Sequence, residues 1–374
     1  MSKQPKIAIV CDFLTTMGGA ENVVLAMHEA FPDAPIYTAM YNEDKMPAFA
    51  ELDVRPSFLQ KIPRKVRTYY KLFPTLAVKA MRRLDLREFD IILTSSYMHG
   101  HQVRKTRPGQ VIINYCHTPP RYYWSHYNEY RRDPGYGNLN PLIRTLMPLM
   151  VPRQRKLDLQ AARQVDVFLA NSTETQQRIK KYYNRNSIVI HPPVDINRFA
   201  PAAKRGDHYV TIGRQLPYKR YDLAVTAATK LGKKLIVFGN GPAHGRLVDL
   251  AGPTVEFRTD RFGDASDAEY EKAITTARGF IYPAEEDFGI VSVEALAAGA
   301  PVIGLARGGT TDIVTSPEVG VLFDRQTSIS VAKAIEQAEK RTFDPTVLRR
   351  TAQRFDKTLF LTKLRKVVRD QMIQ

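Results

Sequence analysis

Two glutamates provide the strongest chemical signal in the sequence. Glu286 and Glu294 stand eight residues apart, the first at the end of a loop and the second within residues 288–298, whose pattern predicts a helix. The peptide N–H groups at the start of a helix have no partner inside it and attract anions. The residues whose N–H groups would lie there are Phe288, Gly289 and Ile290. A diphosphate bound at this helix start, with carboxylates accepting hydrogen bonds from the flanking sugars, would make the ligand a sugar nucleotide.

Two cations, Arg214 and Lys219, add to this interpretation. The glutamates alone also fit an ordinary amphipathic helix with Glu294 on its solvated face. Breaking the bond between a sugar and a nucleoside diphosphate leaves growing negative charge on the diphosphate, and two fixed cations can neutralise it without a metal ion. Arg214 and Lys219 follow an apolar run and could supply those cations, although a basic strand end on a basic protein is the alternative.

Glycine-rich turns follow two of the predicted strands. Gly18 and Gly19 come after the first apolar run, and Gly239 and Gly241 come after a strand predicted at 234–238. The lack of a side chain lets such backbone approach a diphosphate or an acceptor closely. A plain strand-to-helix turn would explain the second pair of glycines equally well.

The cysteines and histidines predict neither a disulfide nor a metal site. Cys11 and Cys116 each close an apolar strand, so we expect reduced packing residues. The sequence holds no Cys/His cluster and no clear Asp-x-Asp motif. We therefore expect no metal and no resident cofactor, with the sugar nucleotide as a substrate.

Residues 285–304 as a whole resemble the E-x7-E signature of retaining glycosyltransferases of the large GT4 family. The likeness includes the Phe-Gly pair after Glu286 and the Glu-Ala-Leu-Ala-x-Gly-x-Pro-Val-Ile run that begins at Glu294. Arg214 and Lys219 match the basic pair of the family's G-R-x(4)-K pattern. The resemblance implies that Glu286 and the two cations are catalytic and that Glu294 helps to bind the donor.

Three further segments resemble parts of the same family. Residues 17–21 are similar to its N-terminal glycine loop, and residues 238–242 are similar to its G-x-G-P turn beside the nucleotide. The run 308–312 stands in the place of G-G-x-x-E but ends in Asp312, so a ligand contact from Asp312 stays open. The resemblance extends from about residue 6 to residue 324 and is strongest in the C-terminal half.

The run His117-Thr118-Pro119-Pro120-Arg121 resembles a subset of these enzymes that includes bacterial mannosyltransferases of surface-polysaccharide and lipopolysaccharide assembly. The resemblance implies that His117 reaches the transferred sugar and is part of the catalytic site. An imidazole can hydrogen-bond a sugar hydroxyl, and the two prolines would restrict the loop that carries it.

The elements that must position these residues alternate between strand and helix, which predicts parallel sheets with helices on both faces. The strands expected in the first series are 6–11, 36–38, 91–95, 111–115, 167–170 and 187–190, and the helices are 20–30, 148–162 and 172–183. After a polar linker, the strands expected in the second series are 209–212, 234–238, 254–257, 279–282, 301–303 and 320–323, and the last helix is 358–372.

A chain of 374 residues with this alternation suits two domains. We expect an α/β fold of two doubly wound, Rossmann-like domains that resembles the GT-B fold, with the ligand in a cleft at the carboxyl ends of both sheets. The N-terminal acceptor domain would be 1–195, completed by a last helix at about 357–374 that crosses back. The C-terminal domain, 196–356, would bind the sugar nucleotide.

The formal net charge of +17 is unevenly distributed. The segment from Arg55 to Leu84, here called the basic segment, contains nine Lys and Arg and no acidic residue, mixed with aromatic and aliphatic side chains. This mixture predicts contact with an anionic membrane surface. Nucleic-acid binding and a merely solvated basic face are the alternatives, and no nucleic-acid-binding motif is visible.

These features predict an enzyme that works at a membrane surface without crossing it. No apolar run reaches the about 20 residues that span a bilayer, and the N-terminus does not resemble a signal peptide, so we expect a cytoplasmic protein, peripheral on the inner face of the cell membrane. The expected activity is a retaining, metal-independent hexosyltransferase acting on a lipid-linked or lipopolysaccharide acceptor, with mannose from GDP-mannose as the first choice of donor. The alternatives are a UDP-sugar-dependent glucosyl, galactosyl or N-acetylhexosaminyl transferase, a nucleotide-sugar epimerase, and a basic nucleic-acid-binding protein.

Overall fold

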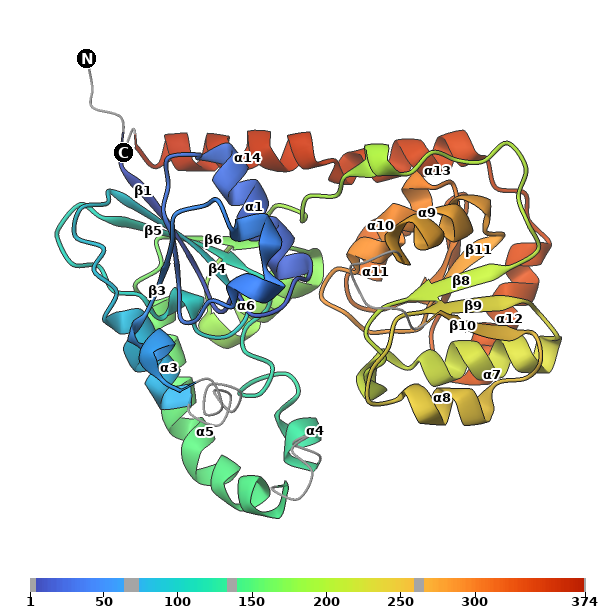
Figure 1. The fold of residues 1–374 in the computed structure, drawn as a ribbon, viewed down its shortest axis with the longest axis horizontal. Helices are drawn as coiled ribbons and strands as arrows, with labels where there is room; N and C mark the ends of the chain where they lie inside the picture. Colours follow the sequence, from blue (N-terminus) through green and yellow to red (C-terminus); the bar gives the residue numbers. More distant parts are fainter. Residues whose placement is uncertain (1–4, 64–73, 133–139, 259–265, 373–374) are drawn as a thin grey trace. The chain divides into compact units, whose positions relative to one another are not determined.

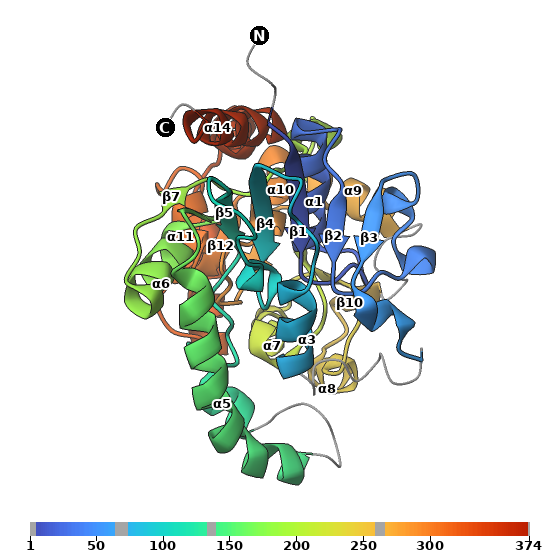
Figure 2. The same cartoon turned by 90° about the vertical axis from the view of Figure 1, so that its left-hand side faces the viewer.

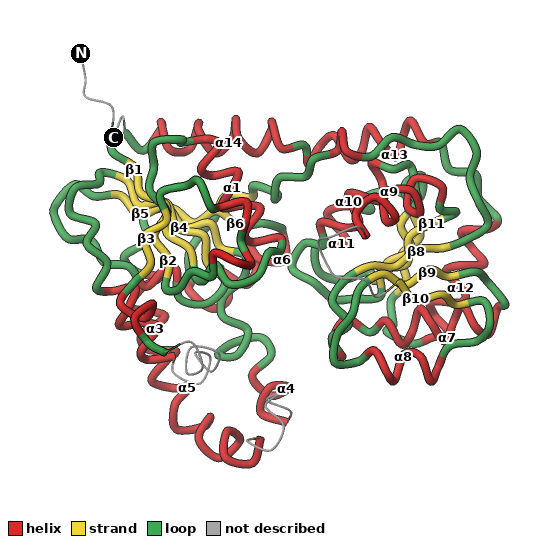
Figure 3. Tube along the Cα trace, viewed as in Figure 1, coloured by secondary structure: helices red, strands yellow, loops and turns green. Residues whose placement is uncertain are grey.

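The chain folds into two compact α/β units (Figures 1 and 3). The computed structural model describes residues 5–63, 74–132, 140–258 and 266–372. Unit 1 comprises Met1–His191 with Leu361–Gln374, and unit 2 comprises Pro192–Phe360. Each unit is built on a parallel sheet, which confirms the expected fold class of two Rossmann-like domains.

Unit 1 is built on a parallel sheet of seven described strands in the order β3-β2-β1-β4-β5-β6-β7. The strands are β1 (Ile7–Cys11), β2 (Ile36–Thr38), β3 (Val54–Pro56), β4 (Ile91–Ser96), β5 (Val111–Cys116), β6 (Val167–Ala170) and β7 (Ile188–Val189). All six residues of the central strand β4 are buried, as expected for a parallel sheet covered on both faces. The polar ends of such strands therefore lie at one edge, where side chains from several strands can meet.

The helices of unit 1 cover this sheet and extend beyond it (Figure 2). They are α1 (Gly19–Ala30), α3 (Pro74–Arg82), α4 (Tyr127–Arg132), α5 (Asn140–Ala162), α6 (Thr173–Tyr183) and the short 3-10 turns η1 (Glu43–Lys45), η2 (Pro47–Phe49), η3 (Phe58–Lys61) and η5 (Gly100–Gln102). The part of α14 (Lys357–Asp370) from Leu361 onward also belongs to this unit. There the Arg365 guanidinium donates to the carbonyl oxygens of Glu29 and Ala30 at the end of α1. The last helix thus completes the first unit, as the GT-B resemblance implies.

Unit 2 is built on a parallel sheet of six described strands in the order β10-β9-β8-β11-β12-β13. The strands are β8 (Tyr209–Ile212), β9 (Leu235–Phe238), β10 (Val255–Arg258), β11 (Gly279–Tyr282), β12 (Val302–Leu305) and β13 (Gly320–Phe323). The helices and 3-10 turns are η7 (Ile196–Arg198), η8 (Pro217–Lys219), α7 (Tyr221–Leu231), α8 (His244–Leu250), α9 (Ser266–Thr276), α10 (Ile290–Ala297), α11 (Thr310–Ile313), α12 (Ser328–Glu339), α13 (Pro345–Ala352) and η9 (Gln353–Phe355). Figure 1 shows α7, α8 and α12 on one face of the sheet and α9, α10 and α11 on the other.

Two predicted helices begin more than one residue away from the expected start. Helix α5 begins at Asn140 and not at 148. The predicted start was wrong because Pro148 and Pro152 lie inside the helix, where proline is normally disfavoured. Helix α10 begins at Ile290 and not at 288, because Gly289 has a φ of +92° and is the N-cap. The short strand β3 was not predicted. Two of its three residues are exposed, so it lacks the apolar alternation that predicts a strand.

Candidate active site

Glu286 is held by two side chains in the loop between β11 and α10. The Lys219 ammonium lies 3.0 Å from Oε1, and the Tyr282 hydroxyl donates a hydrogen bond to Oε2 over 2.7 Å. The side chains of Lys219 and Glu286 are 16% and 20% exposed, so their charges are poorly screened by water. Since both carboxylate oxygens have a partner, the orientation of Glu286 is fixed.

The phenol of Tyr282 is built into the core beneath this loop. Its ring is buried, and burial together with the nearby Glu286 carboxylate raises the pKa of Tyr282 well above its usual value. The hydroxyl therefore keeps its proton and remains a donor. A Cβ at Gly289 would lie 2.9 Å from the Tyr282 ring, so the start of α10 needs glycine both for its positive φ and for this contact.

Glu294, the second glutamate of the pair, also rests on a buried phenol. The Tyr270 hydroxyl donates to Oε2 of Glu294 over 3.1 Å. Burial, with the Glu294 carboxylate as a further cause, raises the pKa of Tyr270 well above its usual value. Neither tyrosine could be recognised from the sequence, because Tyr270 is 24 residues from its partner and Tyr282 ends a strand without any periodic signal.

The glycines at 308 and 309 pack directly on the backbone of the Glu286 loop. The Gly309 N–H donates to the Glu286 carbonyl oxygen over 2.9 Å. A side chain at Gly308 would collide with that oxygen, and one at Gly309 would collide with the backbone of Phe288. These glycines thus fix the course of the loop that carries the carboxylate. Asp312 lies nearby in the chain, in α11, and its contact with a ligand stays a prediction.

The predicted basic pair lies in the turn after β8. Gly213, with a φ of +147°, ends the strand, Arg214 follows it with an exposed side chain, and Lys219 lies in η8. The structure brings Lys219 to Glu286. Lys219 and Glu286 come from turns at the ends of the adjacent strands β8 and β11, as parallel strand ends allow.

Gly239 and Gly241 pack against that same turn. A Cβ at Gly239, whose φ is +99°, would lie 2.5 Å from the Gly213 carbonyl oxygen, and one at Gly241 would lie 2.6 Å from the Gln215 carbonyl oxygen. The buried Gln215 amide donates to the Gly239 carbonyl oxygen over 2.6 Å. The two glycines therefore let two strand-end turns pack closely. Their contact with a nucleotide stays a prediction.

Helix α10 begins two residues later than predicted, so Phe288 is not part of its N-terminus. Phe288 precedes the helix, and its ring is buried in the core of unit 2. The helix start therefore consists of Gly289 as N-cap and Ile290 as the first helical residue. The prediction that Phe288 lies at the helix N-terminus is wrong, because the positive φ of Gly289 turns the chain before the helix begins.

His117 directly follows β5 in unit 1. Its Nε2 lies 2.8 Å from the Ser95 hydroxyl at the end of β4, and its ring packs edge-on against Tyr115 with centroids 5.1 Å apart. Gly18 and Gly19, at the start of α1, lie in the same unit as the N-cap and the first residue of the helix. Contact of these three residues with a sugar or an acceptor stays a prediction.

Asp12, which no sequence motif singles out, organises the loop after β4. Its Oδ2 accepts backbone N–H groups from Tyr97 at 2.7 Å and Met98 at 3.0 Å, and its Oδ1 accepts those of Gly100 at 2.6 Å and of His99. The carboxylate is buried, so these four donors replace the water it has lost. Burial also lowers the pKa of His99 to about 4, so this imidazole is neutral at physiological pH.

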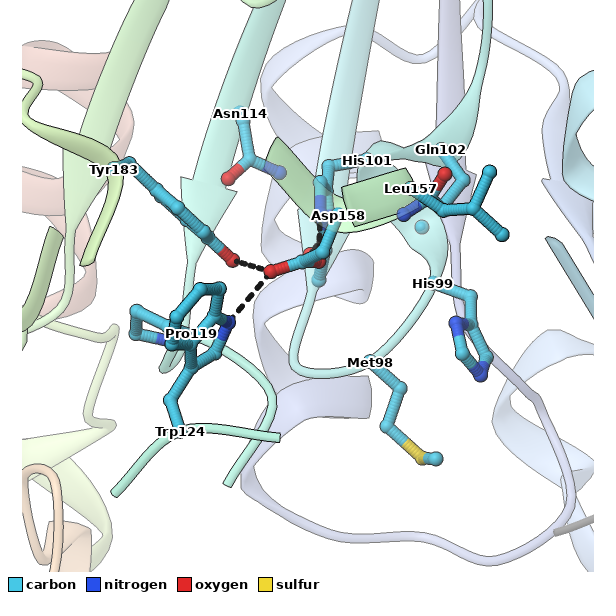
Figure 4. Close-up of polar contacts among 12 residues, drawn as sticks. Met98, His99, His101, Gln102, Asn114, Pro119, Trp124, Leu157, Asp158 and Tyr183 are labelled. Atoms are coloured by element: carbon cyan, nitrogen blue, oxygen red, sulfur yellow. Dashed lines mark hydrogen bonds and ion pairs between the residues drawn. The ribbon is translucent and has the colours of Figure 1, made fainter. Parts of the chain in front are cut away.

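A second buried carboxylate, Asp158 on α5, joins three elements of unit 1 (Figure 4). Its oxygens lie 2.8 Å from His101 Nε2, 2.7 Å from the Trp124 indole nitrogen and 2.8 Å from the Tyr183 hydroxyl. Asp158 is fully buried and His101 nearly so. The network therefore ties η5, the segment after His117 and the end of α6 to one turn of α5.

The described part of the basic segment contributes its apolar side chains to the core. Leu59 and Met81 are buried in the core of unit 1, against which Phe58 and Ile62 pack partly buried, and Val78 is also buried. The residues from 64 to 73, which include Arg64, Lys65 and Arg67, lie outside the described part of the chain. Membrane contact by the basic segment stays a prediction.

The described residues contain neither a cluster suited to a metal ion nor a helix suited to a bilayer. No group of three or more His, Cys, Asp or Glu side chains is placed to hold a metal ion within residues 5–63, 74–132, 140–258 and 266–372. Over the same residues, none of the helices combines the length and the apolar character needed to cross a bilayer.

The two Rossmann-like units, completed by a last helix that belongs to the first, define a GT-B type of fold. Two family models match the chain: Glycosyl transferases group 1 over residues 193–355 and Glycosyltransferase Family 4 over residues 17–198. Together they extend from residue 17 to residue 355, and the chain belongs to the glycosyltransferases that they describe.

Individual relatives share only part of the sequence. A GDP-mannose-dependent alpha-mannosyltransferase of Mycobacterium tuberculosis is 30% identical over 164 residues, 39% of this chain and 42% of that protein. A D-inositol 3-phosphate glycosyltransferase of Salinispora tropica is 27% identical over 234 residues, 52% of this chain and 48% of that protein. The chain thus matches less than half the length of these curated relatives.

Solved structures share the fold over nearly the whole chain. HepE of Anabaena, crystallised in complex with UDP, has a TM-score of 0.68 at 15% identity and covers 97% of this chain and 100% of its own. Sucrose-phosphate synthase of Thermosynechococcus elongatus has a TM-score of 0.69 at 17% identity, over 98% of this chain and 99% of its own. At these identities the likeness concerns the fold.

Proposed function

We propose that this protein is a retaining hexosyltransferase that uses a sugar nucleotide as donor and a lipid-linked or lipopolysaccharide saccharide as acceptor. The observation that supports the proposal is the arrangement around Glu286, whose carboxylate is fixed between the Lys219 ammonium and the Tyr282 hydroxyl beside the start of α10. A carboxylate held in this way is ready to accept hydrogen bonds from sugar hydroxyls, and the ammonium beside it suits an anionic leaving group.

In the proposed reaction the bond between the sugar C1 and the diphosphate oxygen breaks, and a bond forms between C1 and the acceptor oxygen on the same face of the sugar. The proton of the acceptor hydroxyl passes to the departing diphosphate oxygen. Lys219 and Arg214 stabilise the charge that develops on the diphosphate, while Glu286 and Glu294 hold the donor. His117 would hydrogen-bond a hydroxyl of the transferred sugar. The step requires no metal ion.

We propose mannose from GDP-mannose as the donor. The M. tuberculosis relative, which uses GDP-mannose according to its name, supports this choice. A thermal-shift panel with GDP, GDP-mannose, UDP and UDP-glucose tests it, because a ligand at a hundred times its dissociation constant stabilises the fold by about 2.7 kcal/mol. Stabilisation by the guanine nucleotides alone is the expected result. A response to UDP alone would make the protein a UDP-sugar transferase, and no response to any nucleotide would contradict the proposed function.

The acceptor requires a test of its own. We propose that transfer occurs at the cytoplasmic face of the membrane, where the basic segment would add electrostatic attraction to anionic lipid. Incubation of the enzyme with GDP-[14C]mannose and a total lipid extract should move label into the organic phase. Label released only as free mannose would show a donor site without the proposed acceptor, and label in an epimerised nucleotide sugar would point to an epimerase.

A further inference from the structure

Helix α5 carries three strongly exposed leucines on one face. Leu142, Leu146 and Leu149 are 58%, 40% and 75% exposed, although leucine normally lies inside a folded protein. Their spacing of four and then three residues places them one above another along the helix. These three residues are called the leucine face below.

The opposite face of the same turns provides the packing of α5. Met147 and Val151 are buried there and form a cluster with Tyr123, against which several side chains of α4 and its neighbourhood pack. The partly buried members of that cluster are Tyr122, Trp124, Tyr127, Tyr130 and Ile143. The packing contacts that hold α5 on unit 1 therefore do not use the leucine face. Figure 2 shows α5 extending away from the sheet.

The leucine face continues into positive charge. Arg153 and Lys156 are exposed and, at helical spacing, follow the leucines on the same side of α5. Arg153 comes four residues after Leu149, about 6 Å further along the axis. Residues 140–157 contain four basic residues and no acidic one. Apolar side chains followed at this distance by cations match the depth profile of a bilayer surface, where acyl chains lie below the phosphates.

We propose that the leucine face docks α5 on an anionic lipid surface, with the leucines in the upper acyl region and Arg153 and Lys156 against the lipid phosphates. This inference rests on the proposed function, because an enzyme that acts on a lipid-linked acceptor has to bind at the lipid surface. In the described part of the basic segment, Leu59 and Met81 are buried, and Phe58 and Ile62 pack partly buried against the same core. The three leucines of α5 are by contrast strongly exposed. A second copy of the chain fits less well, because two such faces would bring like charges together without an acidic partner.

The test is co-sedimentation with vesicles of phosphatidylcholine alone or mixed with phosphatidylglycerol. The test variant carries Leu142→Gln, Leu146→Gln and Leu149→Gln, since glutamine keeps helix propensity while removing apolar surface. We expect it to bind the anionic vesicles at least about tenfold more weakly than the wild type. A matched control replaces three exposed apolar residues elsewhere, Val248, Ile329 and Leu359, by Gln and should bind as the wild type does.

A second variant, Arg153→Gln with Lys156→Gln, should reduce the salt dependence of binding, because it removes cations and keeps the leucines. Unchanged vesicle binding by the triple leucine variant would overturn the proposal. So would a wild type that ignores anionic vesicles, or one that dimerises through these leucines, as shown by light scattering of wild type and variant.

Hydrolysis of the sugar nucleotide by water separates this inference from the proposed function. The triple leucine variant should hydrolyse the donor at the wild-type rate and melt at the wild-type temperature. If the wild type binds vesicles through the leucine face but neither binds nor hydrolyses any sugar nucleotide, the docking surface stands and the proposed function fails. If it hydrolyses the donor but ignores vesicles, the docking surface fails and the proposed function stands.

Discussion

Removing the hydroxyl of Tyr282 should impair turnover without disturbing the fold. Tyr282→Phe retains the buried ring and loses only the 2.7 Å hydrogen bond to Oε2 of Glu286. A hydrogen bond to a charged group contributes about 1.5–3 kcal/mol, and 1.4 kcal/mol is a factor of ten in rate. If the orientation of Glu286 matters in the transition state, kcat/KM should fall roughly ten- to a hundredfold.

Tyr209→Phe is the matched control. Tyr209 is equally buried in unit 2, and its hydroxyl donates to Oε1 of Glu339 over 3.2 Å, remote in sequence from the Glu286 loop. Both variants lose a hydrogen bond to a carboxylate and should therefore lose about 1.5–3 kcal/mol of unfolding free energy in urea titrations. Only Tyr282→Phe should slow initial rates of donor hydrolysis and of transfer. Equal rates in the two variants would refute the idea that the phenol positions the carboxylate, and a loss of rate in both would trace the effect to stability.

Three further predictions concern the same chain. Lys219→Ala and Glu286→Ala should each lower turnover by at least about ten- to a hundredfold. Because the two side chains lie 3.0 Å apart, the double variant should lose less turnover than the product of the two single losses. A fully additive cycle would show that the two residues act independently. Activity should persist in excess EDTA, since Arg214 and Lys219 would neutralise the leaving group; activity abolished by EDTA and restored by Mg²⁺ or Mn²⁺ would contradict this. Burial raises the pKa of Glu21 from its ordinary 4.5 to about 7. The folded state therefore holds a proton between these pH values that the unfolded state releases, and the unfolding free energy of the wild type should fall, by up to roughly 3 kcal/mol, as pH rises through this window. Glu21→Gln should lack that fall in urea titrations from pH 4 to pH 8, and an equal slope in both proteins would show that Glu21 does not titrate in this way.

Much of the fold follows from local patterns. The bounds of Ile36–Thr38, Val167–Ala170 and Gly279–Tyr282 agree with the predicted strands. Short apolar runs between turn residues leave little choice of where such a strand begins and ends. The first two turns of α5 could not be predicted, because prolines normally mark a helix start and tertiary packing alone keeps them inside this helix.

The candidate site was only partly accessible from the sequence. Family-like spacing singled out Glu286 and Lys219, and the structure brings the two together. Their phenolic and backbone supports were missed, because Tyr270 meets Glu294 across 24 residues, and Asp12 acts through backbone N–H groups that leave no trace in the side-chain pattern. Contacts of this kind depend on how strand ends meet in three dimensions.

The Asp158 network makes α5 a rigid connection between the surface of unit 1 and its interior. Asp158 lies nine residues after Leu149, about 13 Å along the helix, and it grips the Trp124 indole at the end of the segment that begins with His117. Because the carboxylate also holds His101 and Tyr183, a displacement of α5 cannot be absorbed locally without breaking a buried hydrogen bond. If α5 docks on a surface, that contact therefore determines the distance of the His117–Trp124 segment from the surface and its tilt relative to it.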